Sequence, residues 1–375
     1  MISSQVVFLP IGDGKCGDSI AIRFGDLQSG DPAKQYVIVI DGGYTNDWQK
    51  VVDLVLNRFR LSKIDLLIST HLDGDHIGGL PGVVENLKVD NLWMHLPWEH
   101  SGDYLDSRQD EFKGRGYTKD MEDTLSASSD LALAAERAGI TPEEPFTGKQ
   151  FITPYGFLTV LGPSKQYYEK LLPEIVDKSL GSSQSTPPGI ASYYSSSITH
   201  SLQSAIGKIE NHFIETLTDR GETSASNDSS AIIIFELTDG PTSLRRYLFT
   251  GDAGIQALSY AAEYFQLLGY TAGDLNLIQV PHHGSRKNVG PTILDKFLGP
   301  RTALPGMTRG EACVSVGKNC QSDGHPYKVV TNALKRRGYN VFQTQGTGIK
   351  FGEYLEGFSS PAVPLPLYDT VEDDD

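Results

Sequence analysis

The sequence predicts an α/β fold in which helices and sheets pack in layers within a single domain. Apolar segments of strand composition fall into two groups, one in the first 70 residues and one after residue 230, and segments with helical periodicity are interspersed in both. Several of the strands are followed directly by short polar clusters. An alternation of this kind is typical of helices that cover the faces of sheets, with candidate sites at the strand ends.

The first strands and the first helix are predicted within residues 1–70. VVFLPIG and SIAIRF have strand composition and flank the loop at residues 12–18, and YVIVI ends in the turn Asp41-Gly42-Gly43. Residues 46–60 place apolar side chains at helical spacing. KIDLLIST is a continuous apolar run, which is typical of a strand buried on both faces.

The amino-acid composition changes in the middle of the chain. A helix is predicted over residues 128–138, ended by Gly139, and GFLTVLGP is predicted as a strand. Residues 179–204 are then rich in Ser, Gly and Pro, and residues 222–230 read ETSASNDSS. We expect an insert at about residues 179–230, outside the core and flexible, which could act as a lid or a protease target.

The last third returns to alternating strands and helices. The predicted strands are AIIIFEL, RRYLFT, LNLIQV and YNVFQT. The predicted helices are AGIQALSYAAEYFQLL and a segment between Pro326 and Gly338. The domain is predicted to span residues 1–360. The acidic segment 361–375, which ends in four carboxylates, is predicted to be a solvated, disordered tail.

Composition restricts the class of protein. A net charge of −15 counts against a general nucleic-acid binder, although a local basic strip or bound metal ions could still serve a nuclease. The apolar runs are too short to span a membrane, and MISSQ does not resemble the start of a secretory signal. The three cysteines form no C-x-x-C pair, so we expect reduced thiols, and a cytoplasmic protein.

One segment, STHLDGDHIGG, concentrates potential metal ligands. It holds His71, Asp73, Asp75 and His76 in six residues at the end of an apolar run. Imidazoles and carboxylates bind divalent first-row metals, and other strand ends offer Asp252 after YLFTG and the pair His282-His283 after LIQVP. We expect two divalent ions, Mn²⁺ or Zn²⁺ with Mg²⁺ as a further option, because the carboxylates favour a harder ion than a pure zinc site does.

These motifs resemble those of a known family. THLDGDHIGG looks like the H-x-[HD]-x-D-H-x-G-G motif of the metallo-β-lactamase fold, and its Asp at the third position is similar to the hydrolase domain of ComEC-type competence proteins and their stand-alone relatives. Five further segments resemble other motifs of that family, and they occur in the same order: FLPIGDGKCGDSIAI, NDSSAIIIF, LFTGD, PHHGS and SVGKNCQSDGHP. The resemblance implies an αββα sandwich of two mixed sheets with helices on the outer faces. Lys15-Cys16 and the Ser-rich insert depart from the family pattern.

The resemblance also implies residue roles. His71 and Asp73 would bind one ion, Asp75 and His76 the other, and Asp252 would bridge them, with His282 or His283 as the last ligand. Two such ions would hold a nucleophilic hydroxide and polarise a phosphoryl or carbonyl oxygen. Asp75 is the candidate proton shuttle, and His325 is expected to face the site. The supporting residues around the ligands are expected to be Asp41, Asn227, Ser230 and Ser285.

Three functions are compatible with these residues. The first is a metal-dependent hydrolase of phosphodiester bonds, in particular a nuclease. The second is a hydrolase of a small phosphodiester, cyclic nucleotide or lactone, which the acidic composition favours. The third is a catalytically quiet regulatory module, against which the complete ligand set argues. The expected partners are nucleic acid or a small phosphodiester substrate, and a regulatory protein or protease acting on the insert, with no membrane.

Overall fold

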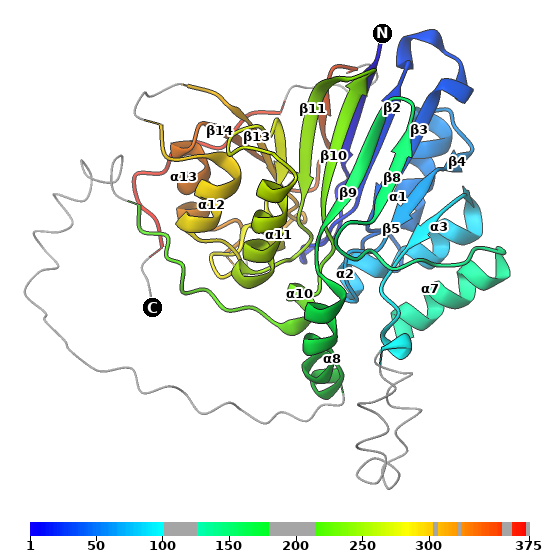
Figure 1. The fold of residues 1–375 in the computed structure, drawn as a ribbon, viewed down its shortest axis with the longest axis horizontal. Coiled ribbons are helices and arrows are strands. Elements are labelled where there is room, and N and C mark those ends of the chain that lie inside the picture. The colour runs from blue at the N-terminus through cyan, green and yellow to red at the C-terminus, as the bar shows by residue number, and fades with distance from the viewer. Residues whose placement is uncertain (101–125, 180–214, 303–306, 321–323, 355–361, 373–375) are drawn as a thin grey trace, which may run out of the picture.

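The computed structural model describes residues 1–100, 126–179, 215–302, 307–320, 324–354 and 362–372. Two mixed sheets lie face to face, and helices cover the outer face of each (Figure 1). This four-layer αββα arrangement is the fold that the sequence predicts. No helix in the described ranges is long and apolar enough to cross a membrane.

The first sheet has the strand order β15-β1-β2-β3-β5-β7. Antiparallel pairing joins β15, β1, β2 and β3, and parallel pairing joins β3, β5 and β7. A separate small parallel pair is formed by β4 (Lys63–Ile64) and β6 (Lys88–Val89). The strands of the first sheet are β1 (Ser3–Phe8), β2 (Ile20–Gly25), β3 (Gln35–Ile40), β5 (Leu66–Ile68), β7 (Leu92–Trp93) and β15 (Ile349–Gly352).

The second sheet has the order β14-β13-β12-β11-β10-β9-β8. Its strands β8 to β11 are antiparallel, and β11 to β14 are parallel. The strands are β8 (Gln150–Thr153), β9 (Gly156–Gly162), β10 (Ile232–Asp239), β11 (Thr242–Phe249), β12 (Leu277–Gln279), β13 (Gly310–Val314) and β14 (Tyr339–Gln343).

The helices divide between the two outer faces. The first sheet is covered by α1, α3 and α7, and the second by α11, α12 and α13, while α2, α8 and α10 lie toward the end of the sandwich that carries the strand-end clusters (Figure 1). The helices are α1 (Trp48–Asp53, continued by a wide helical turn at Leu54–Arg58), α2 (Gly74–Ile77), α3 (Leu80–Asn86), α7 (Ser126–Arg137), α8 (Lys165–Ser179), α10 (Ala225–Asp228), α11 (Ile255–Leu267), α12 (Pro291–Leu298) and α13 (Lys328–Arg336).

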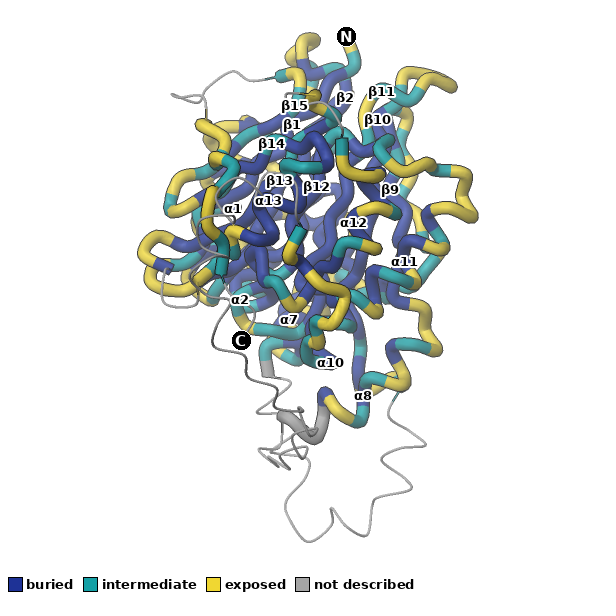
Figure 2. Tube along the Cα trace, turned by 90° about the vertical axis from the view of Figure 1, so that its left-hand side faces the viewer, coloured by how far each residue is buried: buried dark blue, intermediate teal, exposed yellow. Residues whose placement is uncertain are grey.

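Three apolar layers hold the sandwich together, and the burial pattern follows them (Figure 2). Between the sheets, Phe24 and Phe235 meet with ring centroids 4.8 Å apart. Neighbouring residues of β10 alternate between layers, because Ile233 points into this central layer and Ile234 toward the helices of the second outer face. A strand buried on both faces therefore reads as an unbroken apolar run, as AIIIF does.

The expectation of free thiols is wrong for two of the three cysteines. Cys16, in the loop before β2, forms a disulfide with Cys320, which follows β13. Cys313 is free and buried. The partners are 304 residues apart, and their pairing follows from the meeting of two loops at one end of the sandwich.

The expected insert is also shorter than its composition indicates. Residues 180–214 lie outside the described residues, and the prediction of a flexible lid falls mainly on them. Residues 215–230 are packed against the domain, and Leu217, Asn227 and Ser230 are buried. A Ser-rich composition misled here because these hydroxyl and amide groups find hydrogen-bond partners inside the protein.

The described part of the acidic segment, residues 362–372, contains exposed residues, as expected, but it also contacts the domain. The Glu372 carboxylate accepts hydrogen bonds from the backbone N–H groups of Lys328 (3.0 Å) and Val329 (3.2 Å) at the start of α13. The Leu365 backbone N–H donates to the Val341 carbonyl oxygen at 2.7 Å. An acidic side chain is favourable at a helix N-terminus, which explains why this segment docks there.

Candidate metal centre

The polar clusters that follow the strands meet at one end of the sandwich. Asp41 follows β3, the His71–His76 segment follows β5, Asp252 follows β11, and His282-His283 follows β12. The structure therefore brings together all the residues that the sequence predicts as ligands. Their binding of ions stays a prediction, because the chain is described without any ion.

Two carboxylates lie between three of the four histidines. Asp252 Oδ1 is 3.3 Å from His76 Nε2, and Asp252 Oδ2 is 3.7 Å from His282 Nε2. Asp75 Oδ2 lies 3.8 Å from His76 Nε2 and 3.4 Å from His283 Nε2. Asp252 thus presents one oxygen to each side of the cluster, which is the placement that a bridging ligand needs.

The remaining predicted ligands extend the cluster on one side. His71 Nε2 is 3.7 Å from Asp73 Oδ2, and the His71 and His76 rings are 4.2 Å apart. His282 faces the oxygen of Asp252 that is turned away from His76. The sequence left His282 and His283 as alternatives, and the geometry accommodates both: His283 with Asp75 and His76, and His282 with Asp252.

Each histidine is held by its other ring nitrogen. His71 Nδ1 contacts Thr70 Oγ1 at 3.0 Å, His76 Nδ1 contacts Asp41 Oδ2 at 2.8 Å, and His283 Nδ1 contacts the Ser315 carbonyl oxygen at 3.0 Å. His282 Nδ1 is 3.1 Å from Asn288 Oδ1. Such contacts fix the ring and leave Nε2 facing the cluster, as in histidines that bind metals.

The predicted supporting residues differ in what they touch. Asp41 accepts hydrogen bonds from the Thr70 backbone N–H (2.8 Å) and hydroxyl (2.7 Å) in addition to its contact with His76. Asn227 Nδ2 lies 2.9 Å from His282 Nδ1, and Ser230 Oγ accepts from the Asp252 backbone N–H at 3.1 Å. Ser285 contacts no predicted ligand side chain: its hydroxyl accepts from the Lys287 backbone N–H at 3.2 Å and shapes the turn.

His325 lies beside the cluster. It is half-buried, and its ring centroid is 5.8 Å from that of His282 and 6.4 Å from that of His283. That His325 faces the site and acts there stays a prediction.

Three residues of the site adopt a backbone conformation that L-residues rarely use. Asp41 (φ 58°), His282 (φ 47°) and His283 (φ 55°) all lie in the left-handed region. Each such residue costs on the order of 1–3 kcal/mol, and strain of this kind gathers at functional sites. In this protein it turns three strand-end side chains toward one point.

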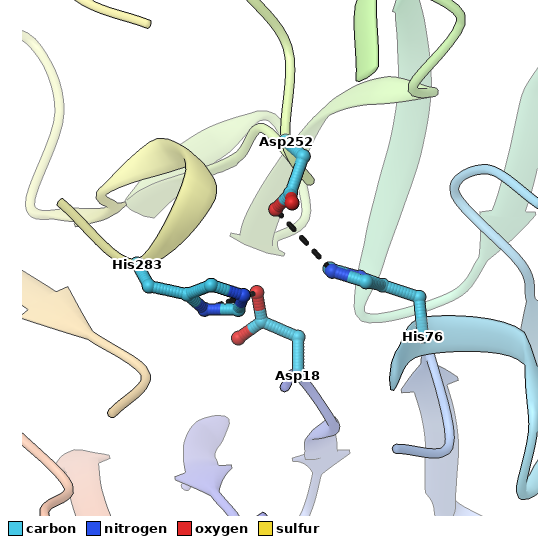
Figure 3. Close-up of side chains that lie close together, drawn as sticks. All are labelled: Asp18, His76, Asp252 and His283. Atoms are coloured by element: carbon cyan, nitrogen blue, oxygen red, sulfur yellow. Dashed lines mark ion pairs between the residues drawn. The ribbon is translucent and has the colours of Figure 1, made fainter. Parts of the chain in front are cut away.

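Sequence reasoning missed two members of the site. Asp18 joins His76, Asp252 and His283 in a buried group whose ligand atoms all lie within 4.8 Å of one another (Figure 3). Ser226, on α10, donates a hydrogen bond of 2.5 Å to Asp73 Oδ1. The motif GKCGDS contained the signal for Asp18, whereas a serine within a Ser-rich segment carries none.

His95 is a further buried histidine of the protein. Its ring stacks on that of Tyr168, with the centroids 4.3 Å apart. Burial lowers its pKa to about 3, so the ring is neutral.

The electrostatics of the cluster are those of a cation site. Burial would raise the pKa of Asp75, but His76 and His283 hold it at about 2. Burial would lower the pKa of His283, but Asp252, Asp75 and Asp18 raise it to about 9. The pKa of Asp252 lies well below its usual range, because its histidine neighbours outweigh its burial. The carboxylates therefore attract positive charge, supplied by protons when no metal is bound.

The hydrogen bonding of the buried carboxylate and imidazole atoms also fits the binding of divalent ions. Among the described residues, the buried atoms Asp18 Oδ1 and His71 Nε2 have no hydrogen-bond partner, and His76 Nε2 and Asp252 Oδ1, 3.3 Å apart, have none besides each other. Buried polar atoms with so few partners are rare in proteins, and here they gather in one cluster of carboxylate and imidazole ligands. Metal coordination would satisfy them.

A family model described as "Metallo-beta-lactamase superfamily" matches residues 33–163. The match includes Asp41 and the His71–His76 segment and covers about a third of the chain. Together with the αββα fold, it identifies a domain of the metallo-β-lactamase superfamily in this protein. No curated protein matches the chain.

Solved structures show distant likenesses. A long form RNase Z from yeast is 12% identical (TM-score 0.33), with 74% of this chain and 32% of that chain covered. The metallo-beta-lactamase fold protein YhfI from Bacillus subtilis is 11% identical (TM-score 0.40), with 94% and 100% covered. A diphosphatase from the PhnP family is 10% identical (TM-score 0.39), with 95% and 100% covered. This chain spans about a third of the length of the RNase Z. All three TM-scores lie below 0.5, so these likenesses assign no activity.

Proposed function

We propose that the protein is a metal-dependent hydrolase of phosphodiester bonds, with nucleic acid as its substrate. The observation that carries the proposal is the buried cluster in which four histidines turn Nε2 toward Asp75, Asp73 and both oxygens of Asp252. The ComEC-like motifs support a phosphodiester substrate, since Asp18, Asp252 and His283, which belong to three of these motifs, lie together with His76 in this cluster.

Two groups of residues would hold two ions. His71, Asp73 and His282 form one group, Asp75, His76 and His283 form the other with Asp18 beside them, and Asp252 reaches both. Divalent ions bound there would polarise a phosphoryl oxygen and activate water at neutral pH.

The chain's own groups would handle the protons. Asp75, whose Oδ2 lies 3.8 Å from His76 Nε2 and 3.4 Å from His283 Nε2, would accept a proton from the attacking water. His325, whose ring centroid lies 5.8 Å from that of His282 and 6.4 Å from that of His283, would donate a proton to the leaving oxygen. Asp41 binds no substrate in this proposal; it keeps His76 oriented.

The test is hydrolysis of labelled single- and double-stranded DNA and of bis(p-nitrophenyl) phosphate with Mn²⁺, Zn²⁺ or Mg²⁺. Asp75→Asn should lower the rate about 100-fold or more, the range for loss of a proton-transfer group. Asp239→Asn, at an exposed strand end, is the matched control and should match the unmodified protein. A metal-loaded protein that cleaves none of these substrates would refute the proposal.

A hydrolase of small phosphodiesters is the second candidate. The net charge of −15 favours it, because a protein that tracks a long phosphate backbone needs an extended basic surface. Cleavage of the nitrophenyl ester without cleavage of either DNA would select this candidate.

A further inference from the structure

A basic cavity lies next to the loop that carries His282 and His283. Its volume is about 270 Å³, and its lining residues are Thr216, Leu217, Thr218, Arg220, Gly221, Arg286, Lys287 and Val329. Pockets that hold a whole small ligand begin at about 300 Å³, so this cavity is suited to one group of a larger molecule.

The walls of this cavity are positive in a protein that is strongly negative overall. Within the described ranges, neither Arg220 nor Lys287 forms an ion pair, and the Arg286 guanidinium lies 5.1 Å from the centroid of the Tyr327 ring. The neighbouring carboxylate of Asp219 does not line the cavity: it accepts hydrogen bonds from the Thr292 backbone N–H (3.1 Å) and hydroxyl (2.6 Å).

One wall of the cavity is tied directly to the candidate metal centre. Arg286 follows His283 by three residues, which limits the distance between their Cα atoms to about 11 Å. Asn288, next to Lys287, contacts His282 Nδ1 through Oδ1 (3.1 Å) and donates to the Asp252 carbonyl oxygen through Nδ2 (2.7 Å).

The other wall is tied to the centre as well. Gly221 packs so closely on the Lys287 carbonyl group that a Cβ atom would collide with it. Two residues further, Thr223 Oγ1 accepts a hydrogen bond of 2.8 Å from Asn227, whose Nδ2 also faces His282. The position of the cavity relative to the candidate ligands is therefore fixed by hydrogen bonds on both sides.

We propose that this cavity binds a second phosphate group of the substrate, a terminal one beyond the phosphodiester that is cleaved. The inference rests on the proposed function and restricts its nucleic-acid substrate to a short oligonucleotide that carries a terminal phosphate. Arg220 and Lys287 contribute the charge, and the hydroxyls of Thr216 and Thr218 add hydrogen-bond donors. A single cavity of this size selects for one phosphate end, whereas a long nucleic acid would require a continuous basic track.

The first experiment measures binding without catalysis. Inorganic phosphate is titrated calorimetrically into the metal-free protein in the presence of a chelator, where the carboxylates of the metal centre repel anions. We expect saturable binding that weakens at least tenfold in the Arg220→Gln/Lys287→Gln double variant. Arg137→Gln, a 71% exposed arginine on α7, is the control and should bind as the unmodified protein does. Absence of saturable binding, or equal binding by the double variant, would overturn the inference.

The second experiment separates this inference from the proposed function. The metal-loaded protein is given a dinucleotide with and without a 5′-phosphate, and an octanucleotide with a 5′-phosphate. We expect the phosphate to lower KM at least tenfold, the double variant to abolish that difference, and the longer chain to add nothing. Equal KM values for the two dinucleotides, or a KM that keeps falling with chain length, would overturn the inference. Phosphate binding without cleavage of any substrate would refute the proposed function and leave the cavity assignment standing.

Discussion

Asp41 shows how one carboxylate can organise the candidate metal centre. It lies at the end of β3 with φ 58° and is fully buried, and its two oxygens receive the Thr70 backbone N–H, the Thr70 hydroxyl and the His76 ring. One residue therefore fixes both the start of the ligand loop and the orientation of a ligand within it. The strained backbone is retained because three hydrogen bonds depend on it.

Asp41→Asn should weaken metal binding about 10- to 100-fold, the range for loss of a group that orients a metal-binding histidine. The amide can still fill the space, but it presents a donor where His76 Nδ1 needs an acceptor. Titration of the metal-free protein with Mn²⁺ or Zn²⁺ measures the effect.

Asp65→Asn is the matched control for this substitution. Asp65 is also a buried carboxylate at a strand end, but it accepts from the Val37 backbone N–H and pairs with Lys63, away from the cluster. We expect this variant to lose stability and to keep the metal affinity of the unmodified protein. An equal loss of affinity in both variants would mean that Asp41 acts through general stability alone.

At the scale of elements, the disulfide between Cys16 and Cys320 joins two loops of the site. Cys16 is two residues before Asp18, and Cys320 is five residues before His325. The same two loops are also paired through the Gly14 backbone N–H, which donates to the Lys318 carbonyl oxygen at 2.6 Å. The crosslink thus holds the first and the last motif of the chain against each other.

Cys320→Ser should lower the free energy of unfolding by about 2–5 kcal/mol, the cost of removing a native disulfide. Thermal melting with and without a dithiol reductant checks this. The reductant should lower the Tm of the unmodified protein to that of the variant and leave the variant unchanged. A reductant effect of equal size on the variant would point to Cys313 or to a nonspecific cause.

The elements that sequence reasoning could predict are those whose signal is local. KIDLLIST contains the strands β4 and β5, and residues 48–58 of the expected helix 46–60 are helical, because burial on both faces and the 3.6-residue period each leave a local pattern. The Cys16–Cys320 pair could not be predicted, since spacing along the chain does not report which loops meet in space. Ser226 could not be predicted as part of the site for another reason. A Ser-rich composition indicates a loop in general, and only the fold shows that the hydroxyl of this serine contacts Asp73.

For the whole molecule, the layers and the ligand loops could be predicted because both depend on apolar strands and on the polar residues directly after them. The docking of residues 362–372 could not, since their acidic composition indicated a solvated end. The Glu372 carboxylate is engaged at the start of α13, which shows that a charged segment can still find a specific partner at a helix N-terminus.

Stability of the whole molecule should depend on pH in a way that reveals the metal centre. In the metal-free protein, His283 has a pKa of about 9, above its unfolded value, so the stability it contributes is full below about pH 6.5 and is lost as pH rises through 9. Asp75 has a pKa of about 2, below its unfolded value, so its contribution is present above about pH 4 and is lost as pH falls through 2. The metal-free protein should therefore be most stable between about pH 4 and 6.5 and should lose stability toward pH 9.

Metal loading should remove the alkaline part of this dependence, because bound cations replace the protons that balance Asp75 and Asp252. Binding near pH 7.5 should consequently release protons, which calorimetry in buffers of different ionisation enthalpy would measure. His283→Gln should reduce both the alkaline loss of stability and the proton release, whereas Arg137→Gln should change neither. A metal-free protein whose Tm is constant from pH 6.5 to 9 would contradict the charge balance on which this argument depends, since the His283 imidazole would then titrate alike in the folded and unfolded chain.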